Sequence, residues 1–220
     1  MTTEIDICNL SLGSIGVSTY LPDGDGTIAG STATSTAALL FKRILPQSRD
    51  LLLREHFWQF ARQYASLTQL SDGTGKEWAD EWGFSYTYPT NCLRVRRLVD
   101  DVGDTSPLPW KWVVRNDGGT KVILTDYDED EAVIEFTARQ TTALDANYMD
   151  LPPESWRQAL VHLLGMQARP TLAKVVRGGP TQADDADLYT YWLGAAIKDD
   201  ANESEERDDP SSSFERARTL

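Results

Sequence analysis

Apolar side chains recur at helical spacing in four segments of the chain, two toward each end. The longest is residues 34–61, TSTAALLFKRILPQSRDLLLREHFWQFA, where Thr34 or Ser35 can cap a helix. Pro46 lies inside it, removing one backbone hydrogen bond and forcing a kink or a local change of register. The aromatic residues at its end present too much apolar surface to stay in water. We therefore expect the chain to be organised around this segment.

Three further helices are predicted to cover it. The first is capped by Thr2 or Thr3 and ends at Gly16, the third begins after Pro152-Pro153, and the fourth starts near Thr181. The apolar side chains expected to meet, which we name the hub residues, are Phe41, Ile44, Leu52, Trp58, Phe60, Trp156 and Leu160.

The middle of the chain changes to the alternating pattern of half-buried strands. Trp82, Phe84, Tyr86 and Tyr88 alternate with small or polar residues until Pro89. Residues 59–70 before them, QFARQYASLTQL, fit a helix better than a strand, although periodicity alone does not settle the choice.

A second run of strands follows. Leu93 and Val95 alternate with arginines and Arg97 breaks the pattern, which predicts a bulged strand with a basic exposed side. Asn116-Asp117-Gly118-Gly119 between apolar runs predicts a hairpin, and residues 132–139 a further strand.

These elements predict an α+β fold, a four-helix bundle interrupted by an inserted antiparallel β-rich domain, with an extended C-terminal arm. The expected boundaries are residues 1–57 and 149–200 for the two halves of the bundle, 58–148 for the β-rich domain, and 201–220 for an acidic linker and arm.

The C-terminal segment has the composition of a docking peptide. From Asp199 to Asp209 it is strongly acidic and almost without apolar residues, so it cannot bury enough surface to fold alone. One aromatic residue, two arginines and a terminal leucine then stand on this polar tether, which is typical of segments that fold on a partner. These residues are Phe214, Arg216, Arg218 and Leu220.

Composition and charge narrow the functional classes. The 220 residues are 40% hydrophobic, with no apolar run of membrane-spanning length and no basic leader at the N-terminus, so we expect a cytoplasmic protein. A net charge of −13 argues against binding to the outside of DNA, but it is compatible with a channel that DNA slides through.

No residue pattern indicates catalysis, a cofactor or a metal. His56 and His162, the two histidines, have no serine, cysteine or carboxylate at a spacing that implies a triad. The aspartates at 23–25 and 126–130 lack the glycine and the glutamate of a calcium loop. Cys8 and Cys92 are expected to be buried thiols, and we predict that the protein is not an enzyme.

The succession of these motifs resembles the head-to-tail adaptors of tailed phages, the tail tubular protein A family. The resemblance covers residues 4–170 and is carried, in order, by ICNLSLGSIG, RILPQSRDLLLREHFWQFA, YTYPTNCLRV and DANYMDLPPESWRQALVHLLGMQAR. Each motif is an apolar helix or an aromatic strand, so the specificity lies in their order. The acidic stretch 199–209 and the tip DYDEDE depart from the family pattern.

The resemblance implies a structural virion protein of the phage neck, without cofactor or membrane contact. Twelve copies would form a ring between the portal ring and a tail nozzle ring of the tail tubular protein B type. DNA would pass through the channel without specific binding, and the C-terminal arm, here Phe214, Arg216, Arg218 and Leu220, would insert at the portal. The alternative is another neck or tail completion protein, or a stand-alone binding module without portal docking.

Overall fold

The computed structural model describes residues 2–18, 20–22, 26–29, 34–99, 111–127, 131–140, 148–172 and 181–204. Contacts divide the chain into two compact units. The helical unit comprises residues 1–52, 58–60 and 141–220, and the sheet unit comprises residues 53–57 and 61–140. Among the described residues, 58–60 and Tyr148, expected in the β-rich domain, belong to the helical unit, and 53–57 belong to the sheet unit.

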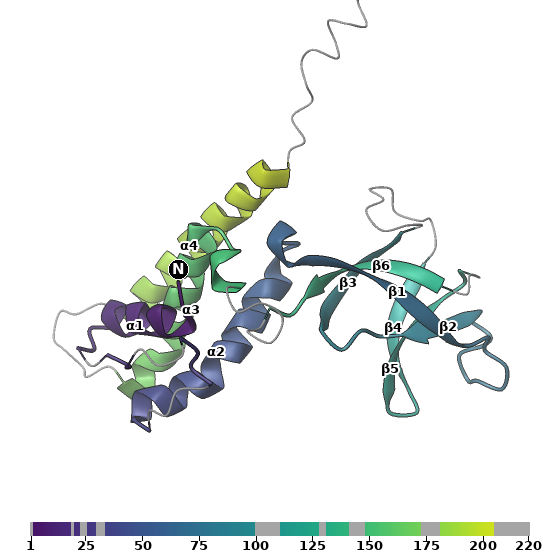
Figure 1. The fold of residues 1–220 in the computed structure, drawn as a ribbon, viewed down its shortest axis with the longest axis horizontal. Coiled ribbons are helices and arrows are strands. Elements are labelled where there is room, and N and C mark those ends of the chain that lie inside the picture. Colours follow the sequence, from purple (N-terminus) through teal and green to yellow (C-terminus); the bar gives the residue numbers. More distant parts are fainter. Residues whose placement is uncertain are drawn as a thin grey trace, which may run out of the picture. The chain divides into compact units, whose positions relative to one another are not determined.

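Four α-helices are present among the described residues, two before the sheet and two after it (Figure 1). They are α1 (Glu4–Ser14), α2 (Thr36–Glu55), α3 (Glu154–Leu172) and α4 (Gln182–Ser204), with short 3-10 turns at Gln59–Ala61 and Tyr148–Asp150. Thr3 and Asp6 form a reciprocal capping box at α1, and the Ser35 hydroxyl accepts the Ala38 N–H at α2. The predicted helix starts at Thr3 and Ser35 are therefore confirmed.

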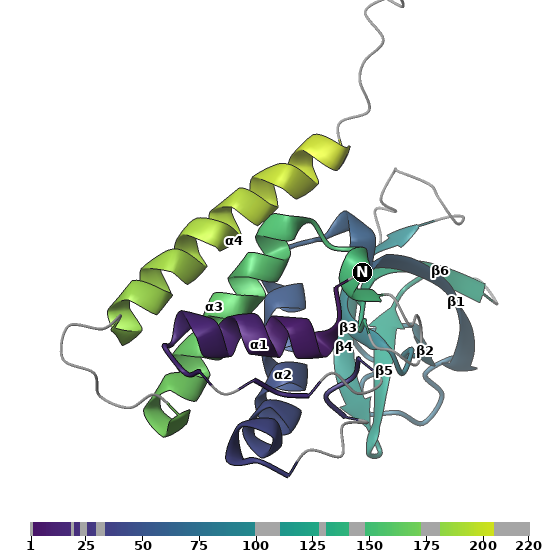
Figure 2. The same cartoon turned by 60° about the vertical axis from the view of Figure 1, so that its left-hand side comes forward.

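The prediction of a four-helix bundle is wrong. The structure is α+β, with helices toward both ends of the chain and a six-stranded antiparallel half-barrel sheet between them. α1 has 11 residues and α4 has 23, roughly 16 Å against 34 Å at 1.5 Å per residue, so α1 cannot line the length of a bundle. It instead crosses α2 and α3, while α3 and α4 lie side by side (Figure 2).

Polar contacts at both ends fix the antiparallel pairing of α3 and α4. Arg169 near the end of α3 contacts Asp185 near the start of α4, with 2.5 Å between Nη2 and Oδ2. At the other end, the Ser155 hydroxyl of α3 donates to Asp199 of α4 (2.5 Å). Asp185 is 1% exposed, so its carboxylate depends on Arg169 as a partner.

The sheet has the strand order β3-β6-β1-β2-β5-β4, and each neighbouring pair is antiparallel. Its strands are β1 (Arg62–Ser71), β2 (Phe84–Thr87), β3 (Cys92–Val99), β4 (Trp112–Asp117), β5 (Thr120–Thr125) and β6 (Glu131–Ala138). The hairpin at Gly118-Gly119 and the bulge between Val95 and Arg97 are confirmed. Residues 62–71, which fitted a helix better, are a strand because they pair with β6 along seven residues.

One face of the sheet encloses the apolar core of the sheet unit. The core side chains come from every strand but β4, namely Leu67, Tyr86, Cys92, Val95, Leu98, Ile123, Ala132, Ile134, Phe136 and Ala138. A smaller cluster joins Trp78 to Val122 and Leu124. These two clusters give the sheet unit a hydrophobic core of its own.

The expectation that β3 has a basic exposed side holds for only part of the strand. Arg94 is exposed, but the Arg96 side chain is 5% exposed and lies 3.5 Å from the equally buried Glu135. Arg97 contacts the same glutamate at 2.5 Å. The buried Arg96 is tolerated here because the Glu135 carboxylate on β6 forms ion pairs with the guanidinium groups of both Arg96 and Arg97.

Candidate functional site

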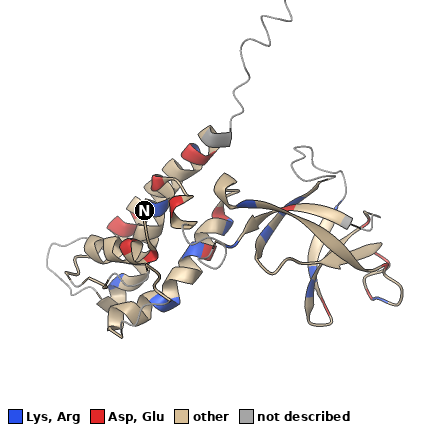
Figure 3. Ribbon diagram, in the orientation of Figure 1, with Lys and Arg blue, Asp and Glu red and all other residues tan. Residues whose placement is uncertain are grey.

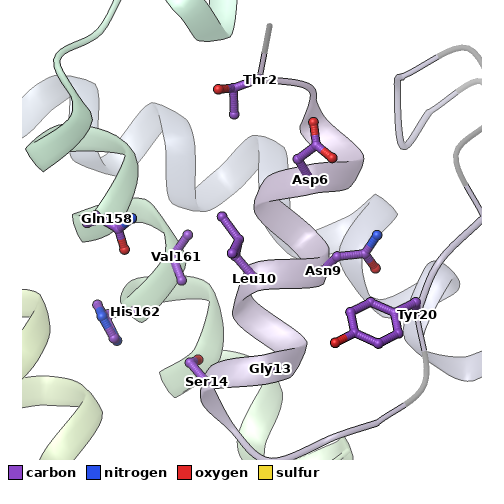
Figure 4. A pocket seen from close by; sticks show the side chains of 10 residues that line it. All are labelled: Thr2, Asp6, Asn9, Leu10, Gly13, Ser14, Tyr20, Gln158, Val161 and His162. Carbon is purple, nitrogen blue, oxygen red and sulfur yellow. The ribbon is translucent and has the colours of Figure 1, made fainter.

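The helical unit has a groove of about 800 Å³ between α1, α3 and the chain that follows α1. Its lining residues are Thr2, Asp6, Asn9, Leu10, Gly13, Ser14, Tyr20, Gln158, Val161 and His162. Leu10 of α1 and Val161 of α3 point toward each other across it, and Tyr20 borders the far side of α1 (Figure 4). Leu10 is 51% exposed and Tyr20 69% exposed, so the groove has an apolar character at its rim.

Most polar groups of this groove are already hydrogen-bonded within the fold. Asp6 accepts the Thr3 N–H and hydroxyl, both at 2.8 Å. Asn9 accepts the Leu21 N–H (2.7 Å) and donates to the Leu21 carbonyl (3.2 Å). The Ser14 hydroxyl donates to the Ser11 carbonyl (2.8 Å). These groups hold α1 and the following chain in place and are not arranged as a nucleophile with its base.

His162 also lines the groove and is a candidate for proton transfer there. Burial lowers the pKa of its imidazole, and the negative charge of Asp185 partly opposes that shift. Its Nδ1 is buried and makes no hydrogen bond. A general base is normally oriented by a hydrogen bond on its second nitrogen, and His162 lacks that support at Nδ1.

A buried polar cluster joins three segments of the helical unit, and the sequence reasoning missed it. The Tyr148 hydroxyl donates to Glu4 Oε1 (2.5 Å) and accepts from Arg49 Nη1 (3.2 Å). The second Glu4 oxygen accepts the Ile28 N–H at 2.9 Å. Arg49 and Glu4 are 5% and 7% exposed, and burial raises the pKa of Tyr148. No local sequence pattern indicated this cluster, because Glu4 and Tyr148 are 144 positions apart.

The hub residues are mostly buried in the helical unit. Trp58 Nε1 donates to the Leu52 carbonyl (2.9 Å), and the Phe60 ring lies 6.0 Å from Trp58 and 5.5 Å from Trp156, centroid to centroid. Phe60 is half-buried. The remaining hub side chains are at most 7% exposed: Phe41, Ile44, Leu52, Trp58, Trp156 and Leu160. This cluster joins the end of α2 to the start of α3.

The predicted arm residues Phe214, Arg216, Arg218 and Leu220 lie outside the described residues, as do residues 128–130 of DYDEDE and the aspartates of 23–25. Cys8 and Cys92 are confirmed as buried free thiols, and burial raises the pKa of each. Across the described ranges no three His, Cys, Asp or Glu side chains form a possible metal site. In the same part of the chain no helix has the length and apolar content needed to span a membrane.

Large apolar side chains are exposed on three helices of the helical unit. Leu10 projects from α1, Leu39 and Leu51 from α2, and Leu188 and Tyr191 from α4, with exposed fractions between 42% and 66%. Tyr191 packs edge-on against Trp192, with 5.2 Å between the ring centroids. Acidic positions also recur along α4, whereas basic ones recur along α2 (Figure 3).

Comparison with known proteins adds no family assignment. No family model matches the chain, and a search of curated proteins finds no match.

Proposed function

We propose that this chain is a structural adaptor of a tailed phage, forming a ring that joins the portal to the tail nozzle and keeps the DNA channel continuous. The observation that carries the proposal is the order of the motifs that resemble the adaptor family. The N-terminal motif forms most of α1, and the RILPQSRDLLLREHFWQFA run forms most of α2 and the turn after it. YTYPTNCLRV covers the end of β2 and the start of β3, and the last motif leads into α3 and forms most of it.

The exposed apolar side chains of the helical unit support assembly of copies. A closed ring needs a heterologous contact, in which two different patches of the same subunit meet. α2 and α4 each carry such apolar residues, Leu39 and Leu51 on one helix and Leu188 and Tyr191 on the other. The opposite charge preferences of these two helices would add attraction between neighbouring copies.

The C-terminal arm is the proposed portal contact. A segment that orders only on binding wraps a large surface while the free subunit stays soluble. Twelve such arms on one ring act at high effective concentration, so the connector resists the pressure of packaged DNA although each contact is weak. An acidic bore would let DNA pass without adhering, and a basic bore in the assembled ring would refute that part.

Truncation after Asp209 tests the proposal. We expect the truncated chain to fold, with unchanged circular dichroism and unfolding midpoint, and to lose its association with portal-bearing heads in native mass spectrometry. The full chain is the positive control. Equal association of both forms would exclude portal docking by the arm and favour the alternative, another neck or tail completion protein or a stand-alone binding module.

An enzymatic function is the remaining class, and His162 in the groove is the one observation that bears on it. In the adaptor proposal His162→Gln leaves association with portal-bearing heads unchanged. A loss of head association in this variant, with the fold intact, would count against the proposal.

A further inference from the structure

One end of the outer face of the sheet, opposite its apolar core, carries exposed arginines. Arg62 on β1 and Arg94 on β3 both pair with Thr137 on the intervening strand β6. Cross-strand partners in an antiparallel sheet project to the same face, so the two arginines flank Thr137 on one surface. Their neighbours Gln63 and Val95 alternate to the other side, where Val95 belongs to the core. Figure 3 shows basic positions on β1 and β3.

The ring of Phe57 packs against the guanidinium groups of the exposed Arg94 and the buried Arg96. The guanidinium carbons of Arg94 and Arg96 lie 4.9 Å and 4.7 Å from the centroid of the Phe57 ring, which is 41% exposed. Arg94 Nη1 also donates to the Arg54 carbonyl (3.3 Å). These contacts restrict the rotamers of Arg94 before any ligand arrives, which lowers the entropy cost of binding. We name Phe57, Arg62 and Arg94, together with the exposed residue Arg54 whose carbonyl Arg94 contacts, the arginine face.

The arginine face carries a local positive charge in a chain whose net charge is −13. Glu135 is buried beneath it and is engaged by Arg96 and Arg97. The exposed Glu55 adjoins Arg54, which leaves the face with more arginines than carboxylates. Guanidinium groups bind carboxylates through paired hydrogen bonds that lysine cannot reproduce. The face is therefore suited to an acidic ligand.

We propose that the arginine face binds the acidic segment 203–209, ESEERDD, of a second copy of this chain. The segment supplies Glu203, Glu205, Glu206, Asp208 and Asp209. The acidic residues before it are already used, because Asp199 accepts from Ser155 and Asp200 accepts the Gln59 N–H at 2.7 Å. A nucleic acid presents phosphates along its whole length, which the rest of a chain of net charge −13 opposes, whereas the short segment 203–209 would be held beside the face by the ring.

This inference rests on the proposed ring, because a ring holds the acidic segment of each copy at high local concentration beside its neighbours. It concerns a different contact from the portal arm. Truncation after Asp209 removes the arm but keeps segment 203–209, so the two contacts can fail independently.

Cysteine pairing between copies tests the contact. Arg94→Cys in one full-length copy and Glu206→Cys in a second, affinity-tagged copy are mixed with portal-bearing heads and oxidised. We expect mixed disulfide-linked pairs at least about fivefold above those formed by Arg43→Cys, an exposed cation on α2, with the same Glu206→Cys partner. Arg62→Cys serves as a second probe of the face and should also exceed the control. Equal yields for the face and control positions, in samples where the copies do associate with the heads, would overturn the proposal, whereas absence of that association would overturn the proposed function.

Two further outcomes would also overturn it. One is disulfide formation within single chains of a double variant, Arg94→Cys with Glu206→Cys, together with no disulfide between the mixed single-cysteine copies. The other is tight binding of a labelled DNA duplex that is lost in the triple variant Arg54→Gln, Arg62→Gln, Arg94→Gln. The matched control has Arg43, Lys111 and Arg115 changed to Gln, three exposed cations elsewhere. We expect no duplex binding by any form, and association of both triple variants with portal-bearing heads.

Discussion

Tyr148 is the residue on which the buried polar cluster depends, because its hydroxyl contacts both Glu4 and Arg49. Tyr148→Phe removes that hydroxyl and leaves a buried carboxylate oxygen and a guanidinium N–H without this partner. We expect a loss of about 1–3 kcal/mol in the free energy of unfolding, measured by urea titration. Tyr20→Phe is the matched control, since Tyr20 is 69% exposed and should change stability little. Equal small losses in both variants would show that the cluster contributes nothing.

His162 makes stability depend on pH. Its folded-state pKa lies below the ordinary histidine value of about 6.5, because burial disfavours the imidazolium. The unfolded chain therefore binds the proton more readily, and the free energy of unfolding falls as pH drops below that value. The stabilising contribution is complete above about pH 6.5 and is lost toward the lower, folded-state pKa.

Unfolding titrations between pH 7.5 and pH 5 measure this dependence. We expect His162→Gln to flatten the pH profile relative to the unchanged chain. His56→Gln is the control for loss of a histidine and should retain the slope. The same slope in all three proteins would mean that other groups account for the dependence.

The β4–β5 hairpin depends on backbone conformation at its turn. Gly118 and Gly119 have φ values of +59° and +90°, and a side chain at Gly118 would meet no atom within 4 Å. A substitution at Gly118 therefore has a conformational cost and no steric clash. We expect Gly118→Ala to lower the free energy of unfolding of the sheet unit by about 1–2 kcal/mol. Gly118→Asn should cost less, because asparagine tolerates this region, and an equal effect of both would contradict the explanation.

The parts of the fold that could be predicted from the sequence are those that depend on a few neighbouring residues. Caps at Thr3 and Ser35, the Gly118-Gly119 turn and the bulge after Val95 each follow from a few adjacent residues, and all are present. The pattern of residues 58–65 wrongly favoured a helix over a strand, because the aromatic and alanine side chains of this segment also fit a helical period. Ala65 faces the sheet core opposite Ile134, a pairing set by residues far along the chain.

The packing of whole elements and the candidate sites depended on long-range contacts that no local pattern encodes. Four apolar stripes suggested one bundle, but the stripes carry no information about crossing angle or relative length. The Glu4–Arg49–Tyr148 cluster unites residues up to 144 positions apart. The groove arises where α1 crosses α3, so His162 could be singled out as a residue but its cavity could not be predicted.

For the whole molecule, the adaptor proposal predicts that α4 is a contact between copies. Leu188 and Tyr191 are 42% and 66% exposed, so replacing both with serine removes apolar surface that the fold itself does not bury. We expect the double variant to keep its free energy of unfolding within about 0.5 kcal/mol, because surface substitutions away from buried contacts have small effects.

Ring formation should respond differently from stability. In native mass spectrometry with portal-bearing heads, the serine double variant should lose ring assembly, since each interface repeats around the ring and every copy loses the same surface. Leu70→Ser is the control, because Leu70 is 51% exposed on β1 of the sheet unit and should assemble normally. Rings formed equally by both variants would rule out α4 as the contact, and the exposed leucines of α2 would then lack the partner that the proposal assigns to them.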